Sequence, residues 1–193
     1  MTREAHIAFA KTQLSEKRMR HVLATEKMAI TLAERFDACV QKASTAALLH
    51  DIAKEWNKEM LLQKAQESGL GLIEEEIASP GLLHGPVGAI VAKESLGIED
   101  EEILAAIANH TTLRAGAGKL EKILYLADLI EETREFCGID IIRETAARDL
   151  EEATLLALAH TMCYVLERQL SLHPKSVAAY NELLKTKREV CFE

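Results

Sequence analysis

The sequence predicts an all-α protein that folds as one compact bundle of helices. Residues that favour helices (Ala, Leu, Glu, Ile and Lys) dominate the composition, and aromatic residues are only 4% of it. Apolar residues recur at helical spacing in one segment after another, whereas no segment shows convincing alternation with β-branched residues. Hydrophobic residues make up 48% of the chain, which is enough for a buried core and argues against disorder.

Capping residues and helix breakers set the expected helix boundaries. Ser15 can cap the first helix, and Pro174 lies just inside the last one. Segments 68–71 and 79–86 contain the Gly and Pro residues that separate helices, and 114–118 is a Gly-containing loop. The predicted helices span 14–36, 42–54, 57–68, 86–96, 100–110, 119–132, 140–170 and 174–188.

These helices are expected to form a single domain over residues 1–193, because no repeat or long linker divides the chain. The core is expected at about 15–135, with C-terminal helices at about 140–188 packed on it. The long helix at 140–170 has an apolar face that could complete the core or form a dimer.

The charge and the hydropathy exclude several classes of protein. A net charge of -8 disfavours a broad nucleic-acid surface, which needs clustered Lys and Arg. Neither a signal peptide nor a membrane span is expected, since the longest later apolar run is 155–159. The four cysteines are widely spaced and form no CxxC pair, as in reduced thiols. We therefore expect a cytoplasmic protein.

Six imidazole and carboxylate side chains interrupt apolar helical segments or lie at their ends. A buried carboxylate is costly unless it is paired or bound to a metal, and one ion can satisfy several such groups. Imidazoles with carboxylates suit Fe, Mn, Co, Ni or Zn better than Mg or Ca. Six ligands exceed one structural zinc and suit two ions that share a carboxylate. The six residues are His21, His50, Asp51, His84, His110 and Asp128.

A purely structural role for these six residues stays open at this point. A single histidine on an apolar helix is usually a hydrogen-bonded core residue, and Asp128 alone could be a buried salt-bridge partner. Sequence spacing does not show that the six residues meet in space. Two further histidines have no such context: we expect His160 in the core or an interface and His6 at the surface.

The ordered set and its flanking segments resemble the HD-domain metal-dependent phosphohydrolases, and among them the YqeK-type family. The likeness extends over about 15–185 and implies a helical bundle of HD type. It also implies a phosphoanhydride hydrolase that cleaves diadenosine tetraphosphate symmetrically to two ADP. The segments that carry the likeness are "LLHDIAK", "LLHGPVGA", "IANHTTLRAGAGKLEKILYLADLIEETREFCGID" and "LHPKSVAAYN".

The resemblance implies two divalent transition-metal ions, with iron favoured and Mn, Co, Ni or Zn as alternatives. One ion would be held by the ligands His21, His50, Asp51 and Asp128. The second would be held by His84 and His110, with Asp51 bridging the two. A hydroxide between the ions would attack a central phosphorus, while Lys54 helps to stabilise the phosphoryl charge. The resemblance also favours a homodimer.

Candidate substrate contacts surround these ligands. Arg18 and Lys54 lie one turn from the proposed ligands, Thr111 follows His110, and Arg134 could pair with phosphate. By resemblance, His173 and Asn181 belong to the wall that faces the nucleotide. Each contact has a bland alternative as a surface, helix-end or loop-closing residue. The family often has proline where this chain has Glu132, which puts the backbone path to Arg134 in doubt.

Three other functions stay open on the sequence. The enzyme could act on different nucleotides, since the metal centre would be the same. The protein could also sense nucleotides without turnover, although its ligand set is complete. A purely structural bundle would explain the core but not the six polar residues.

Overall fold

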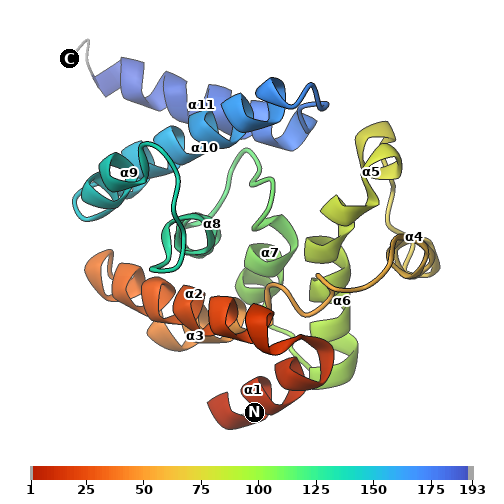
Figure 1. Ribbon diagram of the computed structural model, residues 1–193. Helices are drawn as coiled ribbons and strands as arrows, with labels where there is room; N and C mark the ends of the chain where they lie inside the picture. Colours follow the sequence, from red (N-terminus) through yellow and green to blue (C-terminus); the bar gives the residue numbers. More distant parts are fainter. Residues whose placement is uncertain (1, 191–193) are drawn as a thin grey trace.

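Helices provide all the regular secondary structure in residues 2–190, the part of the chain that the computed structural model describes (Figure 1). This confirms the all-α prediction. The elements are α1 (Arg3–Gln13), α2 (Glu16–Arg35), α3 (Val40–Leu49), α4 (Lys58–Glu67), α5 (Glu74–Ala78), the 3-10 helix η1 (Pro80–Leu83), α6 (His84–Leu96), α7 (Glu101–Asn109), α8 (Lys119–Ile130), α9 (Ile139–Ala146), α10 (Leu150–Glu167) and α11 (Pro174–Val190).

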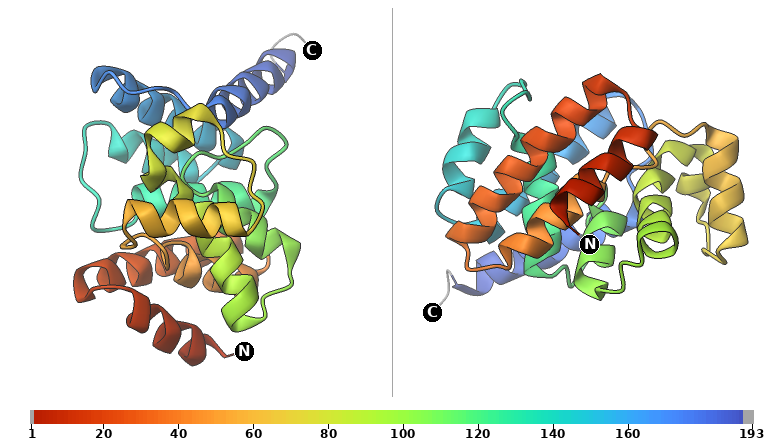
Figure 2. Two further views of the ribbon diagram at one scale, coloured as in Figure 1. Left: turned by 90° about the vertical axis from the view of Figure 1, so that its right-hand side faces the viewer. Right: turned by 90° about the horizontal axis from the view of Figure 1, so that it is seen from below.

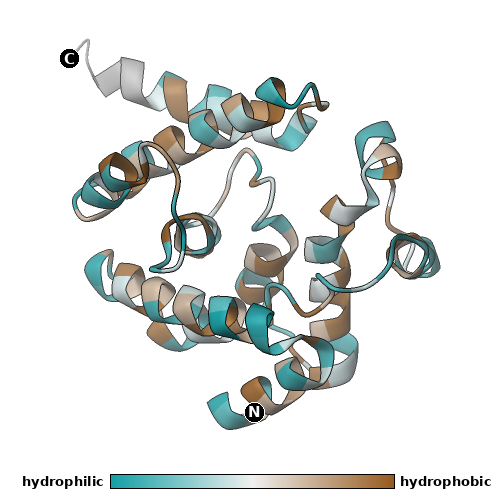
Figure 3. Cartoon of the chain, viewed as in Figure 1, coloured by the Kyte–Doolittle hydropathy of each residue, from teal (hydrophilic) through white to brown (hydrophobic). Residues whose placement is uncertain are grey.

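Helix α8 lies at the centre of the arrangement, between α2 on one side and α10 on the other (Figure 1). Helix α2 also packs on α3, and α7 packs on α3, α6 and α8. Helices α1 and α11 lie at opposite ends of the molecule (Figure 2). Hydrophobic residues are concentrated in the interior helices α6, α7 and α8, whereas α1 and α4 are more hydrophilic (Figure 3). Helices α2, α3, α6, α7 and α8 therefore surround one interior region.

The prediction of a single long helix at 140–170 is wrong, because this segment forms two helices, α9 and α10. The carbonyl of Thr145 accepts hydrogen bonds from the backbone N–H groups of Arg148 and Asp149, which ends α9. The Asp149 carboxylate then accepts a hydrogen bond from the Glu152 N–H and caps α10. The apolar spacing continues on both sides of this break, so periodicity alone did not reveal it.

Helix α1 was also missed, and its attachment corrects the expectation for His6. Arg3 forms a two-bond ion pair with the buried Glu26 of α2, with both N–O distances at 2.6 Å. Ser44 of α3 donates a third hydrogen bond to Glu26. This packing leaves His6 only 4% exposed, so the prediction that His6 lies at the surface is wrong.

Two smaller differences concern the segments next to the candidate ligands. The helix expected at 42–54 ends at Leu49, and residues 50–55 form tight turns instead. The short α5 was not predicted; in it Glu76 accepts a hydrogen bond from the Ile73 N–H. The first change places His50 and Asp51 in a turn, where their side chains can point away from a helix axis.

No helix in residues 2–190 combines the length and the apolar character that a membrane span requires. The cysteines at 39, 137 and 163 are free and exposed. Cys191 lies outside the described residues.

Helices α6 and α7 approach closely because position 85 has no side chain. A Cβ atom on Gly85 would lie 2.9 Å from the carbonyl oxygen of Ala108 and 3.1 Å from that of Ile107. Gly88, one turn later, has more room, with the nearest atom, the His50 carbonyl oxygen, at 3.5 Å. The Gly85 contact brings the first residue of α6, His84, next to the end of α7.

We expect Gly85→Ala to destabilise the protein by separating α6 from α7. Overpacking against backbone typically costs about 1–3 kcal/mol, which corresponds to a melting temperature lower by roughly 2–10 °C. Thermal unfolding followed by circular dichroism in the presence of a chelator would measure this. Gly81→Ala is the matched control, because nothing lies within 4 Å of a Cβ at that position. Equal melting temperatures for the two variants would contradict the close-approach argument.

Candidate functional site

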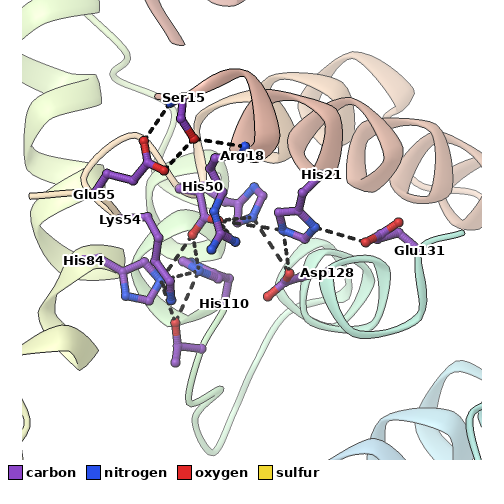
Figure 4. A network of polar contacts seen from close by, with 12 residues as sticks. Ser15, Arg18, His21, His50, Lys54, Glu55, His84, His110, Asp128 and Glu131 are labelled. Carbon is purple, nitrogen blue, oxygen red and sulfur yellow. Dashed lines mark hydrogen bonds and ion pairs between the residues drawn. The ribbon is translucent and has the colours of Figure 1, made fainter. Parts of the chain in front are cut away.

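The six side chains singled out in the sequence converge in the interior region between α2, α3, α6, α7 and α8 (Figure 4). His21 comes from α2 and Asp128 from α8. His50 and His110 directly follow the last residues of α3 and α7, and His84 begins α6. The structure therefore brings together residues that are up to 107 positions apart in the chain, from 21 to 128.

The three histidines at helix ends share one orientation. In each, Nδ1 donates to the backbone carbonyl three residues earlier, at 2.7 Å for His50, 2.6 Å for His84 and 2.7 Å for His110. A neutral imidazole whose Nδ1 carries the proton presents an unprotonated Nε2. These backbone bonds therefore turn three Nε2 lone pairs towards the centre of the cluster, in the arrangement that metal-binding histidines adopt.

His21 is oriented by a carboxylate that the sequence analysis missed. Its Nδ1 lies 3.1 Å from Oε1 of Glu131, which is fully buried. Glu131 also accepts hydrogen bonds from the backbone N–H and the hydroxyl of Thr133. Burial opposes the ionisation of Glu131, but these hydrogen bonds outweigh burial and lower its pKa. The sequence did contain an indication of this role, because Glu131 lies about one helical turn after Asp128.

Asp51 lies between two groups of imidazoles and is 2% exposed. Its Oδ2 lies 3.7 Å from Nε2 of His21 and 3.4 Å from that of His50. Its Oδ1 lies 3.4 Å from Nε2 of His84 and 3.7 Å from that of His110. The two oxygens of one carboxylate thus face two different pairs of histidines, which is the geometry of a bridging carboxylate.

Asp128 completes the group on the His21 side. Its Oδ1 lies 3.0 Å from Nε2 of His21 and 3.9 Å from that of His50. Despite this proximity, the buried Nε2 atoms of His21 and His50 form no hydrogen bond with any described residue. Buried polar atoms in proteins normally have a partner.

The cluster fits a divalent metal. Nε2 of His84 and Nε2 of His110 lie 2.9 Å apart, although both Nδ1 atoms donate to carbonyls and both Nε2 atoms therefore present lone pairs. Two neutral rings repel each other in this arrangement, and a cation bound by both removes the repulsion. Ligands about 2.0–2.2 Å from a common ion are separated by roughly 3–3.5 Å, close to most of the distances above. Imidazole and carboxylate ligands suit a transition metal.

The protonation states agree with this fit. Burial lowers the pKa of His84 to about 4, so this imidazole is neutral at pH 7. Burial opposes ionisation of Asp51, yet the charge and hydrogen bonds of the surrounding histidines hold its pKa well below the usual range. Burial acts on Asp128 in the same way and is outweighed by the close approach of His21. Neutral imidazoles and ionised carboxylates are the forms that bind metals.

Three cations surround the carboxylates, at positions that the sequence indicated. An Arg18 nitrogen donates to Asp51 at 3.0 Å, and an Arg134 nitrogen donates to Asp128 at 2.7 Å. Nζ of Lys54 lies 3.3 Å from Nε2 of His84. Much of the Lys54 side chain reaches solvent, but its charged end lies among buried groups, and this desolvation lowers its pKa.

Thr111 also reaches the cluster, whereas the C-terminal candidates do not. The Thr111 hydroxyl lies 3.2 Å from Nε2 of both His84 and His110. His173 is buried, with Nε2 3.4 Å from Glu76, and its Nδ1 accepts from the Lys175 N–H. Asn181 is exposed on α11, and no polar contact among the described residues joins it to the cluster. His173 therefore has polar contacts at the entry to α11 and none with the cluster among the described residues.

Two other residues from the sequence analysis, His160 and Glu132, form contacts of their own. His160 is half-buried and stacks on Phe136, with the ring centres 4.2 Å apart. Glu132, which replaces the family's proline, forms an exposed ion pair with Lys27. Arg134 still reaches Asp128, so the replacement does not divert the backbone away from it.

Comparison with known proteins adds a family and several relatives. The HD domain family model matches residues 18–159. Proteins named symmetrical bis(5'-nucleosyl)-tetraphosphatase, from Halalkalibacterium halodurans and Bacillus subtilis, are each 38% identical over 186 residues, which is 95% of this chain and 98% of theirs. A crystal structure from Clostridium acetobutylicum, described as a predicted HD superfamily hydrolase involved in NAD metabolism, superimposes with a TM-score of 0.93 at 36% identity, covering 96% of this chain and 98% of the other.

We expect Asp51→Asn to abolish metal binding, because it removes the charge of the carboxylate that faces both pairs of histidines. Affinity should fall by more than about 100-fold, since even outer partners of metal ligands contribute about 10- to 100-fold. Titration calorimetry with Mn²⁺ on chelator-treated protein would measure this. Asp140→Asn, at a position whose side chain is 87% exposed, is the matched control and should bind like the wild type. Retained affinity in Asp51→Asn would contradict the assignment.

The metal-free protein should lose stability as the pH falls from about 6.5 to about 4. Folding lowers the pKa of His84 from 6.5 to about 4, so the unfolded chain binds more protons across this range. His84 alone should contribute about 3 kcal/mol of this loss. Urea unfolding of wild type and His84→Asn at several pH values would show a weaker pH dependence in the variant. The aspartates contribute mainly below about pH 5, where an unfolded Asp with its ordinary pKa of 3.8 begins to take up protons. Parallel pH profiles would contradict the assignment.

Proposed function

The chain belongs to the HD-domain family, and on this basis we propose that it hydrolyses diadenosine tetraphosphate symmetrically to two molecules of ADP. The observation that carries the proposal is the 38% identity, over 95% of the chain, to proteins named for this reaction. The cluster around Asp51 supports it, because that site fits the metal that phosphoanhydride hydrolysis of this family requires.

We propose that the cluster holds two divalent ions. Two sets of atoms support this number: His21, His50 and Asp51 lie within 4.8 Å of one another, and so do Asp51, His84 and His110. Asp128 would complete the first set. Iron is the favoured ion by family resemblance, with Mn, Co, Ni and Zn as alternatives of suitable ligand chemistry.

When bound, such ions supply Lewis acidity and lower the pKa of a coordinated water towards about 7. The chain's own residues hold the donors in place: backbone carbonyls fix three imidazoles, and Glu131 fixes His21. Lys54, Arg18 and Arg134 are proposed to hold phosphoryl oxygens against their mutual repulsion. ADP is a good leaving group, so no dedicated general acid is assigned.

We further propose that the nucleoside of one half lies against the C-terminal helices. A cavity of about 110 Å³ adjoins Thr111 and has mainly apolar walls from α10, including Leu158 and Met162. His173 also lines it. Asn181 is proposed as a contact on family resemblance, together with its place on α11.

The homodimer implied by the family is also part of the proposal. Three apolar side chains near the end of α10 are about half exposed, at 48% for Tyr164, 57% for Leu166 and 54% for Leu170. A second copy that covered them would bury apolar surface now in contact with water.

The metal-loaded protein should convert diadenosine tetraphosphate to ADP as the sole nucleotide product. Separation of products by chromatography would measure this, because asymmetric cleavage yields ATP and AMP instead. A chelator should abolish turnover, and Lys54→Gln should lower kcat by roughly 10- to 100-fold through the loss of a charge at the phosphates. Lys58→Gln, an exposed lysine that begins α4, is the matched control. Equal or faster turnover of simple nucleoside triphosphates would contradict the proposed substrate.

A further inference from the structure

A second, larger cavity adjoins the ligand cluster on the side of His21. Its volume is about 630 Å³, which lies within the usual range for small-molecule sites. His21, Arg18 and Arg134 line this cavity and also contact the two aspartates of the cluster. The cavity therefore borders the proposed reaction site through these three residues. The apolar cavity described above adjoins Thr111 instead, and so lies by His84 and His110.

Four cations line this larger cavity: Lys17, Arg18, Arg20 and Arg134. Two carboxylates line it as well, so four positive and two negative charges leave a formal excess of two positive charges in the lining. Glu131 is buried against His21 and Thr133, and Glu55 accepts hydrogen bonds from the N–H and hydroxyl of Ser15. The whole chain carries a net charge of -8, so this concentration of positive charge is local.

The function proposed above does not use Lys17 and Arg20. Both are exposed, and neither forms an ion pair with any residue that the structure describes. Both lie in the first turns of α2, with Arg18 between them. The N-terminal end of a helix carries partial positive charge, so cations there oppose the helix dipole. These charges do not favour the helix, whereas an anion in the cavity would be attracted by them.

We propose that this cationic cavity binds the departing nucleoside diphosphate, with Lys17 and Arg20 contacting its phosphates. The inference rests on the proposed function and adds a place for the second half of the substrate. Central cleavage breaks the bond from the second phosphorus to the bridging oxygen. The departing ADP keeps that oxygen, the other ADP gains the oxygen of water, and the two protons of that water pass to solvent. The phosphates of the departing half are anionic in the bound substrate as well as in the product, and that charge is what Lys17 and Arg20 would hold in place.

The two cavities together would favour a substrate with four phosphates. One half of the substrate lies by Thr111 and the apolar wall, and the other half lies among four cations. A nucleotide that ends in fewer phosphates places less charge beside Lys17 and Arg20. These two residues therefore act as specificity determinants and do not contribute to metal binding.

The test compares Lys17→Gln/Arg20→Gln with a matched double variant, Lys93→Gln/Lys185→Gln, that removes the same charge from exposed positions outside the cavity. All proteins are loaded with Mn²⁺, and their metal content and melting temperature are measured. KM for diadenosine tetraphosphate should rise roughly tenfold in the cavity variant only, as expected for two partly exposed charge-assisted contacts. Its kcat/KM should also depend less on ionic strength, because fewer charges are screened.

An unchanged KM in the cavity variant, beside an active wild type, would overturn this inference and leave the proposed function standing. A wild type that fails to cleave diadenosine tetraphosphate would overturn both. Arg20→Lys keeps the charge and should recover most of the loss caused by Arg20→Gln. Equal losses in Arg20→Lys and Arg20→Gln would also count against a phosphate contact.

Discussion

The buried carboxylate of Asp51 is the constraint on which the rest of the site depends. An ionised group that is 2% exposed must be compensated, and four imidazoles and one guanidinium lie within 3.7 Å of its two oxygens. Those partners come from three other helices and from the turn that contains Asp51 itself. The same contacts therefore fix the packing of the helices and the electrostatics of the site, and a shift in any one helix would remove part of the compensation of a buried charge.

Helix ends, more than helix faces, make this arrangement possible. His50 and His110 follow the last residues of their helices, where the backbone can still offer a carbonyl three residues earlier. His84 uses the carbonyl of Gly81 in the 3-10 helix in the same way. Each bond fixes both the ring orientation and the protonated nitrogen, so the site needs few side chains to support its histidines. His21 lies inside a helix without a free carbonyl, and there Glu131 takes that role.

The sequence identified the all-α class and the six polar residues, because both depend on local signals. Ligand-type residues in apolar helical segments are conspicuous, and a family resemblance arranged them in order. The contacts that support these residues are harder to predict from the sequence. No neighbouring residue indicates that Gly85 permits close packing of α6 on α7, or that the Glu131 side chain contacts His21. The break at Asp149 and the attachment of α1 through Glu26 depend on hydrogen bonds and tertiary contacts that apolar periodicity does not describe.

The charge distribution connects the site to its proposed substrate. A chain of net charge -8 would repel a polyphosphate at long range, so attraction must come from a local field. Arg18 and Arg134 contact the carboxylates, and Lys54 contacts His84 beside them. Lys17 and Arg20 extend the positive surface along the first turns of α2. Asp51 and Asp128 partly neutralise the first three, but Lys17 and Arg20 have no such partner in the described chain. Two unpaired positive charges therefore lie beside the ligand cluster, and they would attract an anionic chain towards the site from the α2 side.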